Sequence, residues 1–387
     1  MSTQPPRGTH GADLEPAPLR WEHLETAGSW YDIGLVQGRA MRTAVRCSIH
    51  LFLKEMGSFH AGSDRLRALG ETTRRVERFL ARRFPEEWAE LNGLADGAEV
   101  PLPWLVAGNF PAALARVCAD AAPPPAPEEA CSGVIFPDSE WGPLLGGTLD
   151  CLPLRFLMSC RPEGGVPFCC NMWPGMVWAT WGGMNGAGLA LSGASAQPRR
   201  EQYAWQRDTT LGLDHLTSQR VLLRSCRTVA EALDRLGGDD VLPPPGNLGL
   251  LDRTGRAVLI EGYERDTPTL RIREMEEGDG LCWGNYFPWD VRPDDCGDLP
   301  EAQRPLSAFS RVASLRRALD EHRESYSVAA MVQLLSSHDS GAHSPDGDAH
   351  NVCNNSNVLA MLAAPAQGKV LFASKPPCVQ GFVEYPV

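Results

Sequence analysis

The junction between Ala130 and Cys131 offers the clearest chemistry in this sequence. An acidic, proline-rich stretch, Ala119–Glu129, ends there, and Cys131 is followed by Ser132, Gly133 and an apolar run. An exposed stretch that stops at a cysteine suits a cleavable bond. If the bond before Cys131 were cut, that residue would hold a thiol and a free α-amine of pKa about 8, which would serve as the base for the thiol. Taken alone, a cysteine at the start of a strand is more often a small core residue.

A second group of residues has the side chains that bind zinc. It consists of His338, Asp339, His343, His350 and Cys353. Their spacing matches no established zinc finger, and the glycine, proline and aspartates of Ser344–Asp348 are typical of an exposed loop. Adjacent Cys169 and Cys170 cannot both face one side of a strand, which argues against a shared metal there. We therefore expect no metal and no other cofactor.

Composition excludes several classes of partner. The chain has 387 residues, enough for a substantial core, and a formal net charge of −12, which gives nucleic acid no broad electrostatic reason to bind. No stretch approaches the roughly 18 consecutive apolar residues of a membrane helix. The twelve cysteines are spread over a long chain without an export signal. We expect a cytoplasmic protein with reduced thiols.

Apolar periodicity predicts helices before the acidic stretch and a mixture of strands and helices after it. Residues 1–20 lack periodicity and are expected to form a mobile tail. Thr72–Gly97 predicts two linked helices, with Pro85 restarting the pattern. The predicted strands are Ser132–Phe136, Leu144–Asp150, Met176–Trp181, Gly188–Ser192, Leu248–Leu251, Ala257–Gly262, Asn357–Ala363 and Lys369–Ala373. The later predicted helices are Leu213–Leu236, Ser307–His322 and Val328–Ser336. This order indicates an α+β fold with antiparallel sheets.

Seven separated segments carry short motifs in a fixed order. They are Gly28–Gly34 with Gln37-Gly38, Phe84–Gly97, Cys131-Ser132, Gly146–Asp150, Asn185–Ala190, Gly284–Phe287 and Ser310-Arg311. Each motif is short, but their order and spacing resemble those of the acyl-coenzyme A:isopenicillin N acyltransferase family. That family comprises autoproteolytic N-terminal nucleophile cysteine acyltransferases and hydrolases.

This resemblance implies a fold, a processing step and roles for particular residues. The fold is a four-layer α/β/β/α sandwich with two antiparallel sheets. Cleavage between Ala130 and Cys131 would make Cys131 the nucleophile and the new N-terminus, and Asp150 would orient its amine and thiol. The Asn285 amide would stabilise the oxyanion, and Ser310 and Arg311 would support the pocket.

The resemblance also divides the chain into three parts. Residues 1–20 would be the tail, 21–130 a helical pro-segment or α subunit, and 131–387 the catalytic part or β subunit. The last two would fold as one unit, and the cleaved chains 1–130 and 131–387 would stay associated.

Several positions depart from the family pattern near the implied site. Ala130 replaces the usual glycine, and its methyl group would slow or block the backbone rotation that self-cleavage requires. Thr148 stands in place of an asparagine, Gly284 in place of a threonine and Tyr286 in place of a histidine. We therefore expect a substrate different from the penicillin case.

The sequence predicts an enzyme that transfers or hydrolyses an acyl group of a small-molecule amide or thioester through a Cys131 acyl-enzyme. Only three of its 36 basic residues are lysines. This arginine bias, together with the resemblance to the family, points to specialised metabolism. Three alternatives remain open: an unprocessed cysteine amidohydrolase, a catalytically inactive binding scaffold, and a zinc protein built on the histidine-rich stretch. The sequence does not indicate the acyl donor, the acyl acceptor or the oligomeric state.

Overall fold

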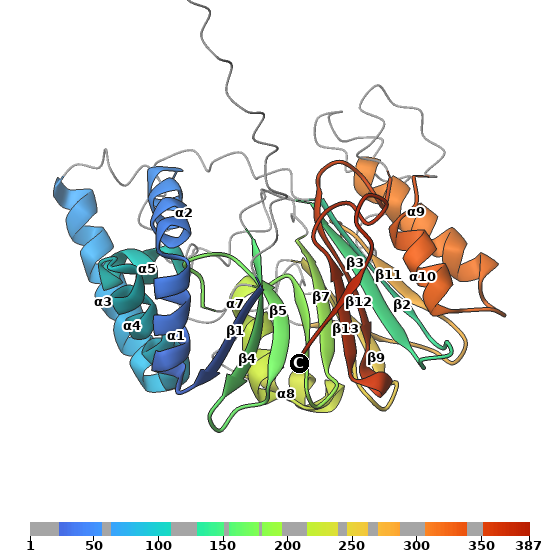
Figure 1. Cartoon of the computed structure of the whole chain (residues 1–387), viewed down its shortest axis with the longest axis horizontal. Coiled ribbons are helices and arrows are strands. Elements are labelled where there is room, and N and C mark those ends of the chain that lie inside the picture. The colour runs from blue at the N-terminus through green and yellow to red at the C-terminus, as the bar shows by residue number, and fades with distance from the viewer. Residues whose placement is uncertain are drawn as a thin grey trace, which may run out of the picture.

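Four layers make up the protein, in the order helices, sheet, sheet, helices (Figure 1). The computed structural model describes residues 23–55, 63–109, 130–150, 155–177, 180–195, 215–238, 246–261, 270–286, 306–338 and 351–387. The tail 1–20 and the stretch Ala119–Glu129 lie outside these described residues. The layer order confirms the predicted α+β four-layer sandwich.

The first sheet, sheet A, has eight strands in the order β1-β4-β5-β6-β7-β8-β9-β10. They are β1 His23–Gly28, β4 Phe156–Pro162, β5 Phe168–Met172, β6 Gly182–Asn185, β7 Ala190–Ser195, β8 Gly246–Leu251, β9 Ala257–Glu261 and β10 Arg271–Glu274. The prediction of purely antiparallel sheets is wrong at one edge, because β1 and β4 run parallel. A parallel pair needs a long crossover connection, and the chain between β1 and β4 includes a series of helices.

The second sheet, sheet B, has six strands in the order β11-β2-β3-β12-β13-β14. They are β11 Leu281–Trp283, β2 Ala130–Phe136, β3 Leu144–Asp150, β12 Asn357–Ala364, β13 Lys369–Ala373 and β14 Val383–Tyr385. Strand β2 lies between β11 and β3. Cys131 is paired with Leu149, near one end of the ladder between β2 and β3. The predicted strands around this position and the predicted closing hairpin are confirmed.

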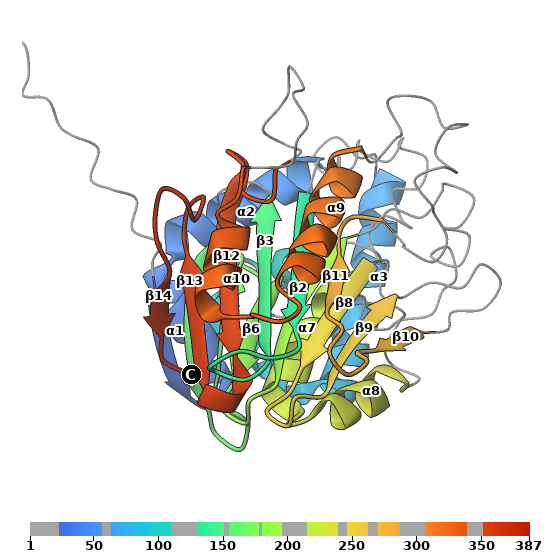
Figure 2. The same cartoon turned by 90° about the vertical axis from the view of Figure 1, so that its right-hand side faces the viewer.

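Helices cover the outer face of each sheet (Figures 1 and 2). Sheet A is covered by α1 Trp30–Ala40, α2 Arg42–Glu55, α3 Ser63–Arg83, α4 Pro85–Ala98, α5 Leu102–Asn109, α7 His215–Ser225 and α8 Val229–Leu236, which share one apolar core with it. Sheet B is covered by α9 Leu306–Glu321 and α10 Val328–Leu335. None of the helices in the described ranges is both long and apolar enough for a membrane span.

The stretch Leu213–Leu236 is helical as predicted over the residues that the structure describes, but it forms two helices, α7 and α8. The Thr228 side chain accepts a hydrogen bond from the Glu231 N–H and caps a new helix. The Val229 N–H is taken by the Asp252 carboxylate at 2.9 Å. These bonds satisfy N–H groups that a continuous helix would have used within itself.

The hairpin predicted around Asn185-Gly186 exists, but its first strand is β6, not Met176–Trp181. The N–H groups of Trp181 and Gly182 both donate to the Asn171 side-chain oxygen, at 3.1 and 3.0 Å. A side chain therefore takes hydrogen bonds at the end of this apolar run, and the ladder with β7 begins at Gly182.

Two ion pairs, one fully buried and one partly buried, join α4 to α7. The Arg220 guanidinium forms a bidentate pair with Glu90, at 2.7 and 2.9 Å, and Arg224 contacts Glu87 at 2.9 Å. Burial raises the pKa of Glu90, while Arg220 acts in the opposite direction. Loss of one partner of such a pair costs about 3–5 kcal/mol, because an uncompensated charge stays buried.

Candidate active site

Cys131 lies near the start of β2, with its side chain in the apolar core between the two sheets and only 2% exposed. Its neighbour on β3, Leu149, belongs to the same core. The thiol is therefore shielded from bulk solvent.

Asn285 lies just beyond the end of β11 and contacts the backbone of Cys131. Its side-chain oxygen accepts the Cys131 N–H at 2.6 Å and one Arg311 N–H at 3.1 Å. Its side-chain nitrogen donates to the Ser195 carbonyl at 2.7 Å. Because both groups that face the oxygen are donors, the orientation of the amide is fixed. The oxygen, not the nitrogen, faces Cys131.

The backbone around Asn285 is held by Asn247 of β8. The Asn247 side-chain nitrogen donates to the carbonyls of Gly284 and Tyr286, both at 2.7 Å. These bonds hold the backbone on either side of Asn285, so the Asn285 side chain contacts Cys131 from a fixed position.

Trp283 anchors β11 on the two sheets. Its indole ring is completely buried and lies against Gly133 and Gly249, where a Cβ atom on either residue would overlap the ring. Because Trp283 lies two residues before Asn285, this close approach sets the position of the site.

Gly133→Ala is therefore expected to destabilise the protein by about 1–3 kcal/mol, the usual cost of overpacking a core. Thermal unfolding measures the loss, and activity of the folded fraction should fall as Asn285 shifts. Gly381→Ala is the matched control, because a Cβ at Gly381 meets no atom within 4 Å. Equal melting temperatures for the two variants would contradict this account of Trp283.

Arg311 brings a positive charge to the site from the first half of α9. Its side chain is completely buried. Burial lowers the pKa of the guanidinium, while Asp150 and Cys131 act in the opposite direction. Ser310 precedes it on the helix and is half-buried. Of this predicted pair, Arg311 supplies the contact with Asn285.

Asp150 ends β3 and is paired with Ala130 on one side and Asn357 on the other. Its carboxylate accepts hydrogen bonds from the side-chain amides of Asn354, at 3.0 Å, and Asn357. Side chains alternate along a strand, so Asp150 points away from the face on which Leu149 and the Cys131 thiol lie. Asp150 is thus next to the Ala130–Cys131 bond, on the side of α9.

Four site residues were missed in the sequence. Asn354 and Asn357 hold Asp150, Ser195 accepts from Asn285, and Asn247 fixes the backbone. The only sequence signal was the asparagine-rich run Asn351–Asn357 before a predicted strand.

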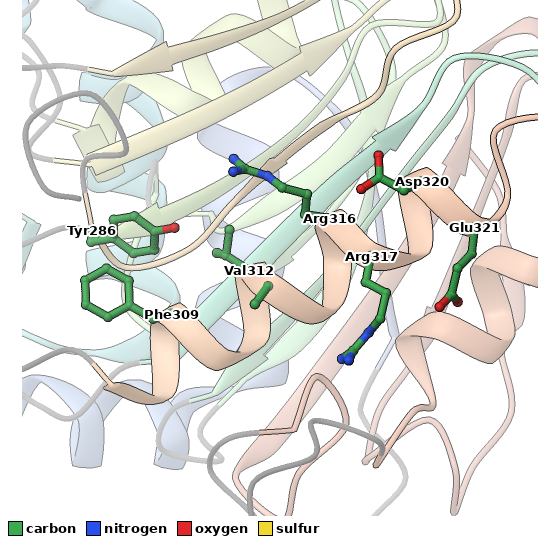
Figure 3. A pocket seen from close by; sticks show the side chains of 8 residues that line it. Tyr286, Phe309, Val312, Arg316, Arg317, Asp320 and Glu321 are labelled. Atoms are coloured by element: carbon green, nitrogen blue, oxygen red, sulfur yellow. The ribbon is translucent and has the colours of Figure 1, made fainter. Parts of the chain in front are cut away.

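A cavity of about 380 Å³ lies along α9, beside the site (Figure 3). The rings of Tyr286 and Phe309 meet edge to face at one end, with centroids 4.5 Å apart. Charged side chains of α9, including Arg316 and Asp320, line the rest. The cavity lies on the outer side of sheet B, whereas the Cys131 thiol faces sheet A.

Several other thiols lie in apolar surroundings that suppress their reactivity. Burial raises the pKa of Cys160 to about 11 and that of Cys169 to about 12, and it also raises the pKa of Cys170. Cys169 and Cys170 face different cores, as their adjacency predicted. The raised pKa values leave little thiolate at neutral pH, so we expect these thiols to be weak nucleophiles.

No family model matches this sequence, and no curated protein matches it. Among solved structures, the chain is similar to the N-acylethanolamine-hydrolyzing acid amidase ortholog of Caenorhabditis elegans, at 14% identity and TM-score 0.43, over 61% of this chain and 93% of that one. It is also similar to penicillin V acylase from Agrobacterium tumefaciens (14%, TM-score 0.40, 63% and 83%). A third likeness is to a mutant of conjugated bile acid hydrolase from Clostridium perfringens (12%, TM-score 0.37, 66% and 97%).

Proposed function

We propose that this protein is an N-terminal nucleophile cysteine enzyme that hydrolyses or transfers the acyl group of a small-molecule amide or thioester. The observation that carries the proposal is the contact of the Cys131 N–H with the Asn285 oxygen at 2.6 Å, beside the buried Arg311. The nitrogen that cleavage would turn into a free amine therefore already has a hydrogen-bond acceptor, the Asn285 oxygen.

In the mature enzyme, Cys131 supplies both nucleophile and base. The Asn285 oxygen accepts a hydrogen bond from one N–H of the α-amine. This bond fixes the orientation of the amine and therefore the direction of its lone pair. The amine, with a pKa of about 8, takes the thiol proton as the thiol attacks the acyl carbon. The positive charge of Arg311 favours the thiolate. The C–N or C–S bond of the substrate breaks, and the α-amine returns the proton to the departing amine or thiol. The acyl group on the Cys131 sulfur then passes to water or to an amine.

Asp150 is proposed as a positioning residue. Two asparagine amides hold its carboxylate beside the backbone of Ala130, and its charge lies near Arg311. It therefore keeps the guanidinium in place and balances its charge, while Ser310 supports the same end of α9.

Maturation would use the same thiol. Cys131 Sγ attacks the carbonyl carbon of Ala130, the peptide C–N bond breaks, and the nitrogen takes up a proton to become the amine. The resulting thioester is hydrolysed by water to the Ala130 carboxylate and the free thiol. The methyl group of Ala130 makes this step slower than it would be with glycine.

Self-cleavage is tested by the intact mass of freshly purified protein. We expect two chains, 1–130 and 131–387, that co-elute in size-exclusion chromatography. The same preparation is assayed against N-acyl amino acids, acyl peptides and acyl-thioesters. A chain that stays whole after long incubation yet turns over substrate would favour the unprocessed amidohydrolase, and a whole, inactive chain would favour the binding scaffold.

A further inference from the structure

Three metal-ligand side chains from distant parts of the chain meet at one end of sheet B. They are His338, which follows α10, Cys353, in the loop before β12, and Cys378, in the segment after β13. Their ligand atoms all lie within 4.8 Å of one another. His338 and Cys378 are exposed, and Cys353 is buried.

The fold itself brings these three segments together. Ala360 pairs with Ala373, so the loop entering β12 and the segment leaving β13 lie at the same end of the hairpin. The Cys353 N–H donates to the Ser337 carbonyl at 3.0 Å, which ties the loop to the end of α10. Cys378 sits in a turn closed by the Val379 N–H and the Pro376 carbonyl at 2.8 Å.

We propose that His338, Cys353 and Cys378 bind one zinc-like divalent cation. Two thiolates and an imidazole bind Zn²⁺ in preference to hard cations such as Mg²⁺ or Ca²⁺. Tetrahedral ligands about 2.3 Å from an ion lie about 3.8 Å apart, so this cluster reaches coordination distance by side-chain rotation and small shifts. Cys353 and Cys378 are not joined by a disulfide. A water molecule takes the fourth position.

This proposal departs from the sequence-based expectation of no metal. Within the stretch 338–353 the spacing of the metal-binding side chains matches no zinc finger. The third ligand, Cys378, lies beyond the closing hairpin and enters only through the fold. Asp339, His343 and His350 lie outside the described residues.

The site would stabilise the loop that holds Asp150. Cys353 directly precedes Asn354, and both Asn354 and Asn357 donate to the Asp150 carboxylate. A cation on Cys353 fixes one end of this loop to α10 and to the segment after β13. Its role is structural and does not depend on the proposed acyl chemistry.

The test uses the full chain, purified under reducing conditions, stripped with a chelator and titrated with Co²⁺ and then Zn²⁺. We expect about one Co²⁺ per chain, a thiolate-to-cobalt charge-transfer absorption, and its loss when Zn²⁺ displaces the cobalt. Cys378→Ser and His338→Gln alter exposed side chains, so both variants should fold. Each should weaken Zn²⁺ binding by at least about 10- to 100-fold, the loss seen when groups around metal ligands are removed.

Cys47→Ser is the matched control, because Cys47 is also exposed but lies on α2, in the other helical layer. It should bind Zn²⁺ as the unaltered protein does. Absence of the charge-transfer absorption, or equal Zn²⁺ affinity in Cys378→Ser, would overturn the proposal. So would peptide mapping that shows a Cys353–Cys378 disulfide persisting under the reducing conditions of purification.

Discussion

Cys131→Ala is expected to yield an uncut chain of 387 residues without measurable turnover. The substitution removes the attacking sulfur from both maturation and catalysis. Deleting a catalytic nucleophile lowers kcat by roughly 10⁴- to 10⁶-fold. Intact mass and steady-state assays on one preparation measure both losses, and the melting temperature shows whether the variant is folded.

Cys169→Ala is the matched control for this substitution. Cys169 lies in the same core between the sheets, so its replacement creates a comparable small cavity, but burial raises the pKa of its thiol to about 12. This variant should be cleaved and active. A Cys131→Ala protein that retains turnover, or a Cys169→Ala protein that loses it while folded, would refute the assignment of the nucleophile.

Asn285→Ala is expected to lower kcat/KM by about 10²- to 10³-fold, the loss typical of one hydrogen-bonding group at a reacting centre. The melting temperature should fall only modestly, because each lost hydrogen bond contributes about 0.5–1.5 kcal/mol. Kinetics and thermal unfolding on the same sample measure both. A stable variant with near-normal kcat would remove Asn285 from the site.

Asn285→Asp separates two roles for this side chain. It keeps an oxygen that accepts from the Cys131 nitrogen but loses the N–H₂ group that would donate to an oxyanion. Because the oxygen faces Cys131 in the structure, we expect activity to recover at alkaline pH. The carboxylate raises the pKa of the amine, so the acidic limb of the pH–rate profile should move to higher pH. A loss as large as that of Asn285→Ala at every pH would instead assign the amide to the oxyanion.

Local patterns predicted much of the fold. Leu144–Asp150 and Lys369–Ala373 form strands with the predicted bounds, and Pro85 begins a new helix as expected. The prediction failed where one side chain decided the outcome. Thr228 and Asp252 divide the predicted helical stretch into two helices, and Asn171 takes the N–H groups at the end of a predicted strand.

The candidate site shows the same division. The resemblance placed Cys131, Asn285 and Arg311 together, and the structure joins them through the Asn285 oxygen. It gave no indication of Asn354 or Asn357, which reach Asp150 across more than half the length of the chain. Hydrogen bonds between such distant residues leave no spacing pattern in a single sequence. The catalytic roles of Cys131, Asn285 and Arg311 stay predictions until variants are measured.

The ladder between β1 and β4 and the ion pairs of Arg220 and Arg224 join residues from opposite sides of the Ala130–Cys131 bond. If that bond is cut as proposed, these contacts connect two separate polypeptides. Unfolding then releases two molecules, and refolding becomes a bimolecular reaction whose yield falls on dilution. The precursor would assemble the fold as one chain, and the cleaved protein would keep it only through slow unfolding. Cleavage would thereby convert a structure that re-forms readily into one that is made once.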